Sequence, residues 1–152
     1  LLSLPCGSAA DIPSGNRTLE LVDPDPYALQ AAKERHPNAV VSQETFDGFV
    51  FDTAISTFVY CGLSEYLTER EVIGHLNKIA QTLEVDGRLI TSTTERNDSQ
   101  ALMKKYLGWH TRARSSKDFV ELLERCGFIV CSTWSDPNRI QTVFEAKKAP
   151  DQ

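Results

Sequence analysis

The chain opens with Leu1-Leu2-Ser3-Leu4-Pro5-Cys6-Gly7-Ser8-Ala9 and then reaches Leu19-Glu20-Leu21-Val22-Asp23, and these two stretches decide its fold. Each begins as a short apolar run typical of a buried strand. The first run ends in a turn of small residues, and the second ends in a carboxylate. A βαβ unit that holds an adenosine-type cofactor uses these two parts, because the turn exposes backbone N–H groups and the acid accepts from the ribose hydroxyls.

The composition indicates one globular domain with an acidic surface. At 152 residues and 41% hydrophobic, the chain is long enough to bury a core. A net charge of −5 argues against nucleic acid as a partner, because phosphate binding needs a basic face. No run approaches the ~20 apolar residues of a membrane span, so we expect no membrane partner. The 4 cysteines have neither disulfide-motif nor zinc spacing, so we expect reduced thiols, a cytoplasmic protein and no metal site.

Strand-like and helix-like patterns alternate along the chain. Capping residues mark three helix starts: Asp25 before Pro26, Thr68 with Glu71 three residues later, and Ser115. The predicted strands cover residues 1–4, 18–22, 39–42, 49–56, 88–92, 128–134 and 140–146. The segment 8–12 is at most a short helix, the segment 13–16 is a break, and 97–108 is an exposed helix. The pattern predicts a single α/β domain that ends in a pair of strands.

That terminal pair distinguishes between two families that share the first βαβ unit. A dinucleotide dehydrogenase half does not end in this way, whereas the chain from Leu1 to about Lys148 resembles a class I S-adenosylmethionine-dependent methyltransferase. Five segments are similar to that family's motifs in order: Leu1–Ala9, Val22-Asp23, Gln43-Glu44-Thr45, Phe51-Asp52-Thr53-Ala54-Ile55-Ser56 and Leu83-Glu84-Val85-Asp86-Gly87-Arg88-Leu89. The stretch Trp109–Ser115 followed by Cys126-Gly127-Phe128 is similar to a bacterial group of small-molecule methyltransferases.

The resemblance implies a three-layer Rossmann-like methyltransferase fold with a mostly parallel sheet and an antiparallel C-terminal strand pair. It implies one S-adenosylmethionine-binding domain over residues 1–148 and a tail over residues 149–152. Because the sequence lacks an initiator Met and begins directly on a strand, we also expect that an N-terminal segment is absent from it.

The resemblance also implies which residues bind S-adenosylmethionine. These are Pro5, Cys6, Gly7 and Ser8 in the first loop, Asp23 and Pro24 at the ribose, Glu44 and Thr45 at the adenine, and Ser56, Thr57 and Phe58 where the predicted fourth strand ends and methyl donor and acceptor meet. Three positions depart from the family pattern. Ser3 replaces an acid, and Pro5 and Ala9 replace glycines, which weakens the expected close approach of the cofactor.

The catalytic and acceptor-binding residues are less constrained. His110 is a candidate general base or a surface residue, and Tyr60 and Tyr66 are each a candidate gate or a core ring. Arg112 and Arg114 precede a helix N-terminus, so together they could bind a carboxylate, or they are solvated or ion-paired within the domain. Cys61 would be a nucleophile only beside a base, and packing is the alternative.

We therefore expect methyl transfer from S-adenosylmethionine to a small molecule by in-line displacement. Oxygen or carboxylate acceptors are favoured because no obvious base is present. Two alternatives remain open. One is an inactive cofactor-binding relative that acts as a partner or regulatory protein, and the other is a nicotinamide-dependent oxidoreductase, against which the missing third glycine counts. A nucleic-acid methyltransferase would need a basic face or a base-flipping motif such as Asn-Pro-Pro-Tyr, and the sequence has neither.

Overall fold

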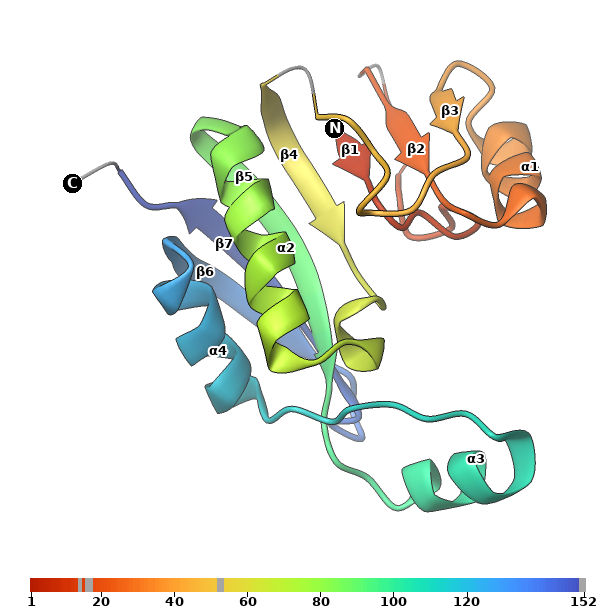
Figure 1. Ribbon diagram of the computed structural model, residues 1–152, viewed down its shortest axis with the longest axis vertical. Coiled ribbons are helices and arrows are strands. Elements are labelled where there is room, and N and C mark those ends of the chain that lie inside the picture. Colours follow the sequence, from red (N-terminus) through yellow and green to blue (C-terminus); the bar gives the residue numbers. More distant parts are fainter. Residues whose placement is uncertain (14, 16–17, 52–53, 151–152) are drawn as a thin grey trace.

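A mixed sheet organises the domain in the computed structural model, which describes residues 1–13, 15, 18–51 and 54–150 (Figure 1). Within these residues the sheet has seven strands in the order β3-β2-β1-β4-β5-β7-β6. The strands are β1 (Leu2–Ser3), β2 (Glu20–Val22), β3 (Val40–Ser42), β4 (Ile55–Tyr60), β5 (Leu83–Thr94), β6 (Phe128–Ser135) and β7 (Gln141–Lys148). All pairs from β3 to β5 are parallel, whereas β7 is antiparallel to both β5 and β6. The predicted mostly parallel sheet with an antiparallel C-terminal pair is confirmed.

The helices begin where the sequence places their caps. They are α1 (Pro26–Arg35), the 3₁₀ turn η1 (Ser64–Tyr66), α2 (Glu69–Thr82), α3 (Ser99–Leu107) and α4 (Ser116–Arg125). Asp25 accepts a hydrogen bond from the backbone N–H of Tyr27, and Thr68 and Glu71 form a reciprocal capping box. Ser115 caps α4 in the same way as Asp25 caps α1. These local predictions are confirmed because each depends only on residues within one turn.

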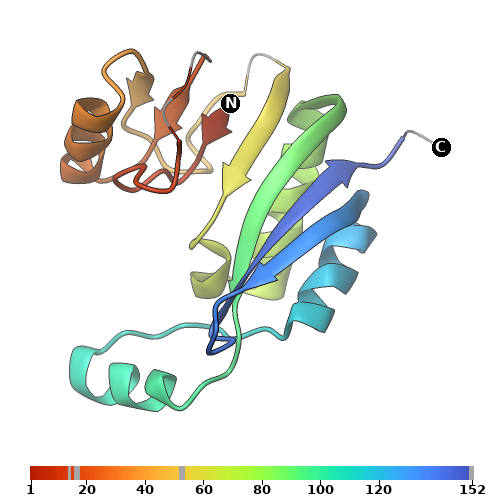
Figure 2. The same cartoon turned by 180° about the vertical axis from the view of Figure 1, so that it is seen from behind.

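Two cores lie on opposite faces of the sheet. The larger core packs beneath α2 and α4 and contains the aromatic side chains Phe58, Tyr60, Phe119, Phe128 and Phe144. The smaller core packs beneath α1 and consists of Cys6, Ala9, Ile12, Leu19, Leu21, Leu29, Ala32 and Ala39. Strand β2 contributes Val22 to the larger core and Leu21 to the smaller one, and successive strand residues face opposite sides. In Figure 2, seen from the side opposite α2 and α4, the described residues leave strands β5, β7 and β6 without a covering helix.

The predicted fourth strand over residues 49–56 is wrong, because β4 runs from Ile55 to Tyr60. The apolar run Phe49-Val50-Phe51 lies before the strand, and Phe49 and Phe51 pack on the larger core through ring contacts, whereas Val50 is exposed. The ring centroids of Phe51 and Phe58 are 5.9 Å apart, and those of Phe49 and Phe51 are 5.0 Å apart. Apolar spacing alone does not distinguish a strand from a loop whose aromatic side chains are buried by tertiary contacts.

The segment between β1 and β2 contains no helix among its described residues. Gly7 and Ala9 have φ values of 51° and 50°, which belong to the left-handed region and interrupt a right-handed helix. The short helix considered for residues 8–12 is therefore replaced by successive turns. Ser14 and Asn16 of the predicted break, Asp52 and Thr53 of the fourth motif, and residues 151–152 of the tail lie outside the described residues.

Asp86 and Gly87 form an irregularity within β5. Asp86 has a φ of 61°, and the pairing with β4 jumps from Ile55–Leu83 to Thr57–Arg88. A Cβ atom at position 87 would lie 2.8 Å from the carbonyl oxygen of Glu84, so only glycine fits there. Between these two paired positions β5 therefore advances by five residues while β4 advances by two.

Candidate cofactor and acceptor site

The carboxyl ends of the parallel strands form the edge at which open α/β sheets bind ligands. In this chain that edge is made by the loop after β1, the tip of β2 at Asp23, the segment after β3, and the ends of β4 and β5. Leu4 N donates to the carbonyl of Val59, which places the first loop level with Tyr60 and Cys61 at the end of β4. The sequence predicts that the first loop and Asp23 lie close together at this edge, and the hydrogen bonds of Asp23 test that prediction.

Asp23 ties the first loop to the tip of β2. Its Oδ2 accepts from the backbone N–H of Gly7 at 2.8 Å, and its Oδ1 accepts from the backbone N–H of Asp25 at 2.9 Å. The residue is only 7% exposed. A carboxylate oxygen has two acceptor positions, so each oxygen of Asp23 keeps one that these bonds do not use. The carboxylate is therefore both a loop anchor and an oriented acceptor pair.

The first loop keeps the backbone conformation of a glycine-rich turn although two of the expected glycines are replaced. Gly7 and Ala9 both have positive φ values, and Ala9 is buried in the smaller core. A Cβ atom added to Gly7 would meet nothing within 4 Å, so open space adjoins this residue. Ser8 is exposed at the turn, whereas Pro5 is half-buried and Cys6 is buried. Burial raises the pKa of the Cys6 thiol to about 12, which keeps it protonated at neutral pH.

The segment after β3 joins the same edge through a side chain that the sequence analysis did not single out as a site residue. The amide of Gln43 donates to the carbonyl of Pro24 at 3.2 Å and so links the ends of β2 and β3. Glu44 is exposed, and the hydroxyl of Thr45 accepts from the backbone N–H of Gly48 at 3.1 Å. Glu44 is thus positioned in solvent beside the edge, and Thr45 stabilises its own turn.

The predicted contacts of Ser56, Thr57 and Phe58 with cofactor or substrate are not supported by their positions. Because β4 runs from Ile55 to Tyr60, these are its second to fourth residues and not its exit. Phe58 pairs with Leu2 at the start of β1 and is completely buried in the larger core. The carboxyl end of β4 is instead formed by Cys61 and Gly62. The shifted strand boundary accounts for the error.

Tyr60 is a core residue rather than an exposed catalytic group. It is completely buried, and its hydroxyl is hydrogen-bonded to Nδ1 of His75 at 2.9 Å. Burial raises the pKa of the Tyr60 hydroxyl. His75 is itself only 9% exposed and stacks on the ring of Phe46. His75 lies on the buried face of α2, and its spacing from Val72 and Ile79 is the sequence signal for that position.

The arginine pair does not converge on one ligand. The guanidinium of Arg114 donates to the carbonyl of Ser64 at 2.6 Å and to that of Leu67 at 2.5 Å, so it is committed to the turn η1. The side chain of Arg112 is exposed and close enough to Glu71 to contribute to the lowered pKa of that carboxylate, which chiefly reflects hydrogen bonds from Thr68. The interpretation of both as a joint carboxylate site is corrected to one structural arginine and one solvated arginine.

The remaining candidate residues are Tyr66, His110 and Cys61, and each has its own environment. Tyr66 is 44% exposed, and its hydroxyl accepts from the indole N–H of Trp109 at 2.6 Å. His110 is exposed. Cys61 is half-buried, and burial raises its pKa to about 11, so it is a neutral thiol rather than a nucleophilic thiolate.

A cavity of about 350 Å³ lies beyond the carboxyl end of β5, between η1, α3 and the start of β7. It is lined by Glu65, Thr94, Asn97, Ser99, Gln100, Met103, Trp109, Thr111, Ile140 and Gln141. The sequence analysis named none of these as a site residue, and Trp109 and Thr111 appeared only within the stretch Trp109–Ser115. Glu65 carried no recognisable signal, because it lies in a three-residue turn without a motif of its own.

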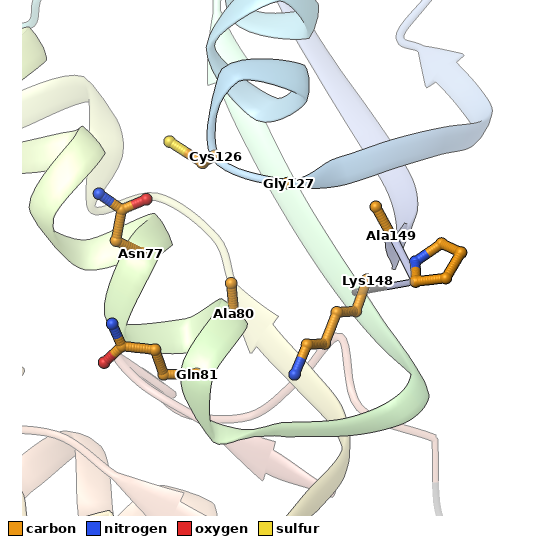
Figure 3. Close-up of a pocket in the computed structure, with 8 residues that line it drawn as sticks. Asn77, Ala80, Gln81, Cys126, Gly127, Lys148 and Ala149 are labelled. Carbon is orange, nitrogen blue, oxygen red and sulfur yellow. The ribbon is translucent and has the colours of Figure 1, made fainter. Parts of the chain in front are cut away.

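A second cavity, of about 460 Å³, lies at the opposite end of the sheet (Figure 3). It is lined by Asn77, Ala80, Gln81, Cys126, Gly127, Lys148, Ala149 and Pro150. These residues come from the end of α2, the turn before β6 and the end of β7. The ammonium of Lys148 donates to the carbonyl of Leu83 at 3.3 Å. Ligands of open α/β sheets bind at the carboxyl ends of the parallel strands, so this cavity is not the predicted site.

Solved structures share this architecture over almost the whole chain. A possible exported protein from Bordetella parapertussis matches 98% of this chain and 61% of its own length, with a TM-score of 0.79 and 18% identity. Magnesium protoporphyrin IX methyltransferase from Synechocystis matches 97% of this chain and 73% of its own, with a TM-score of 0.79 and 13% identity. The chain has the class I methyltransferase fold. The N-methyltransferase NodS from Bradyrhizobium japonicum shares it, with a TM-score of 0.75 and 11% identity over 98% of this chain and 77% of NodS.

The methyltransferase fold is thus established by structure alone. Neither the known family models nor the curated proteins contain a sequence match to this chain. The chain spans 61% of the length of the Bordetella protein, so the similarity describes only part of that protein. Within the described residues, no helix is long and apolar enough to cross a membrane, and no group of His, Cys, Asp and Glu could hold a metal ion.

Proposed function

We propose that this chain transfers a methyl group from S-adenosylmethionine to a small-molecule acceptor. The observation that carries the proposal is the tie between Gly7 and Asp23 at the carboxyl edge of a methyltransferase-type sheet. The Synechocystis structure contains bound S-adenosylhomocysteine, and NodS has been solved in complex with the same molecule. These structures support the cofactor through their shared fold.

The residues at the edge fit the cofactor. Each oxygen of Asp23 retains an acceptor position for a ribose hydroxyl, and Gly7 adjoins open space into which a ligand can approach the backbone. Pro5, Cys6 and Ser8 complete the first loop, Pro24 follows Asp23, and Glu44 and Thr45 follow β3 toward the adenine end. When bound, the cofactor supplies an electrophilic methyl group on a sulfonium sulfur. The chain's own contribution is to align donor and acceptor and to exclude water.

We further propose oxygen as the acceptor atom. Arg112 and Arg114 were the candidates for orienting a carboxylate, but Arg114 donates to two carbonyl oxygens of the chain, so the pair does not support a carboxylate acceptor. A hydroxyl that ionises easily remains favoured, because Tyr60 is buried and its hydroxyl is hydrogen-bonded to His75, so it does not face the acceptor as a general base. A cytoplasmic location is proposed because Cys6, Cys61, Cys126 and Cys131 are all unpaired.

One observation keeps a second function in view, that of an inactive relative that acts as a partner or regulatory protein. Three backbone N–H groups of the first loop are already used within the chain: Cys6 donates to Val22, Gly7 to Asp23, and Ala9 to Cys6. Pro5 has no N–H to offer. A loop with so few free donors would hold the cofactor mainly through Asp23.

The test is calorimetric titration of the chain with S-adenosylmethionine, S-adenosylhomocysteine and, as a control, NAD. We expect both sulfur ligands to bind and NAD not to bind. Asp23→Asn should weaken S-adenosylhomocysteine by roughly tenfold or more, because it removes a charge-assisted acceptor. Asp25→Asn is the matched control, since it makes the same charge change nearby and asparagine remains a good N-cap.

The outcomes separate the functions. Failure of the wild-type chain to bind either sulfur ligand would refute the cofactor assignment. NAD binding would favour the oxidoreductase, and equal losses in the two variants would show that Asp23 is no ribose ligand. Binding without transfer to any hydroxyl acceptor would favour the inactive relative.

A further inference from the structure

The cavity beyond β5 has the size and position of a small-ligand site. Its volume of about 350 Å³ falls within the range of roughly 300–1,000 Å³ that small-molecule sites occupy. Figure 1 shows α3 projecting past the carboxyl end of β5, and the cavity lies where α3 returns toward the sheet. It lies at the carboxyl side of the sheet, on the same side as the first loop and Asp23.

One wall of the cavity carries a negative charge with no cation to balance it. Among the described residues that line the cavity, Glu65 is the only ionisable one. It is half-buried, and it forms no ion pair with any other described residue. Its Oε2 accepts a hydrogen bond from the hydroxyl of Thr94, which fixes the carboxylate and leaves Oε1 unused by the described residues. A partly desolvated carboxylate of this kind favours a positively charged partner.

The neighbouring cations face elsewhere. The segment 109–112 has no regular secondary structure, and two of its four residues line the cavity. Trp109 and Thr111 line the cavity, whereas His110 and Arg112 do not. Arg114 is held by the carbonyls of Ser64 and Leu67. A ligand anion would therefore meet Glu65 without compensation.

Several neutral polar side chains of the cavity form hydrogen bonds within the chain. The amide N–H of Gln100 donates to the hydroxyl of Thr111 at 3.1 Å, and the amide of Asn97 donates to the carbonyl of Glu95 at 3.0 Å. The hydroxyl of Thr94 donates to Glu65. Each of these two amides keeps a second N–H and Thr111 keeps its O–H, so the neutral groups can both donate and accept, and the charge of Glu65 is what favours a cationic ligand.

The opposite wall is apolar and rigid. Met103, Trp109 and Ile140 form it. The indole of Trp109 is fixed by its hydrogen bond to Tyr66, so its ring is available for packing without an unsatisfied N–H. A thioether and an indole are favourable contacts for a flat ring, and the indole face also attracts cations.

We propose that this cavity binds a small organic cation, in which a protonated amine meets Glu65 and a flat apolar group packs against Trp109 and Met103. The proposal rests on the proposed function in one respect, because it takes the bound cation to be the methyl acceptor, which Glu65 binds through its ammonium group. It assigns the acceptor to amine-bearing molecules and excludes simple carboxylic acids.

The test uses Trp109 as its reporter. The chain has 2 tryptophans, so Trp134→Phe in an exposed part of β6 leaves Trp109 as the only indole. Three probes of matched size are titrated by fluorescence: 2-phenylethylamine, 2-phenylethanol and 3-phenylpropionate. We expect the amine to bind roughly tenfold tighter than the alcohol, as one charge-assisted hydrogen bond provides, and the acid to bind most weakly.

Two variants test the role of the carboxylate. Glu65→Gln should abolish the preference for the amine over the alcohol, while Glu121→Gln, on the exposed face of α4, makes the same change in net charge and should preserve it. Circular dichroism confirms that each variant is folded. The selectivity among the three probes needs no variant, so the proposal stays testable if Glu65→Gln is unstable.

Each outcome supports or overturns the proposal. Equal binding of the three probes, preference for the acid, or no fluorescence change with the amine would overturn it. Displacement of the amine by S-adenosylhomocysteine would assign the cavity to the ammonium of the cofactor's amino-acid part and would also overturn it. Amine binding without any binding of S-adenosylmethionine would support the cavity assignment and refute the proposed function, so the two failures are distinguishable.

Discussion

Replacing Arg114 should destabilise the fold, whereas replacing Arg112 should not. The guanidinium of Arg114 holds the carbonyls of Ser64 and Leu67 and thereby fixes η1 against the segment that leads to α4. Hydrogen bonds with one charged partner contribute ~1.5–3 kcal/mol each. Because Arg114 is half-buried and partly screened by water, the lower end applies, and we expect Arg114→Ala to cost about 3 kcal/mol in free energy of unfolding.

Urea denaturation followed by circular dichroism measures this cost. With a denaturant slope of about 2 kcal/mol per molar, the midpoint should fall by roughly 1.5 M. Arg114→Lys retains the charge but cannot reach both carbonyls in the same fork, so its midpoint should be intermediate. Arg112→Ala removes an exposed side chain and should change stability by less than about 0.5 kcal/mol. Equal midpoints for Arg114→Ala and Arg112→Ala would refute the structural role and revive the shared ligand site.

Two further predictions concern buried polar groups. Asp23→Ala should lower the free energy of unfolding by about 2–3 kcal/mol, because it leaves the N–H groups of Gly7 and Asp25 without their acceptor. Asp25→Ala removes only a helix cap and should lower it by about 1 kcal/mol. Equal urea midpoints for the two variants would contradict this prediction. Burial lowers the pKa of His75 below its ordinary 6.5, so below that pH the unfolded chain binds more protons and the free energy of unfolding falls. His75→Gln should lose less stability than the wild type between about pH 7.5 and about pH 5.5, and parallel losses would contradict the assignment.

The sequence predicts features that depend on neighbouring residues. The cap at Asp25 and the capping box at Thr68 were predictable because donor and acceptor are within three residues of each other. The antiparallel end of the sheet was implied by the family resemblance, and it agrees with the tendency of strands joined by a short turn to pair with each other. The approach of Gly7 to Asp23 followed from the requirement that β1 and β2 be parallel neighbours.

Features that depend on tertiary packing were not predictable. The run Phe49-Val50-Phe51 has the composition of a strand, and only its ring contacts with the core show that it precedes one. Arg114 has the spacing of a ligand-binding residue, but its partners lie about fifty residues away in η1. Glu65 becomes notable only when α3 and the start of β7 meet it across a cavity.

The division of the interior into two cores has a consequence for local unfolding. The core beneath α1 is built mostly from small or aliphatic side chains, and it supports strands β1 and β2 of only 2 and 3 residues. Amide hydrogens in that half should therefore exchange with solvent through openings of lower free energy than those of β5 and β7. Because Gly7 and Asp23 belong to this half, any ligand held by them selects its closed form. Slower exchange at Gly7 and Asp25 would then be the first physical sign that the edge is occupied.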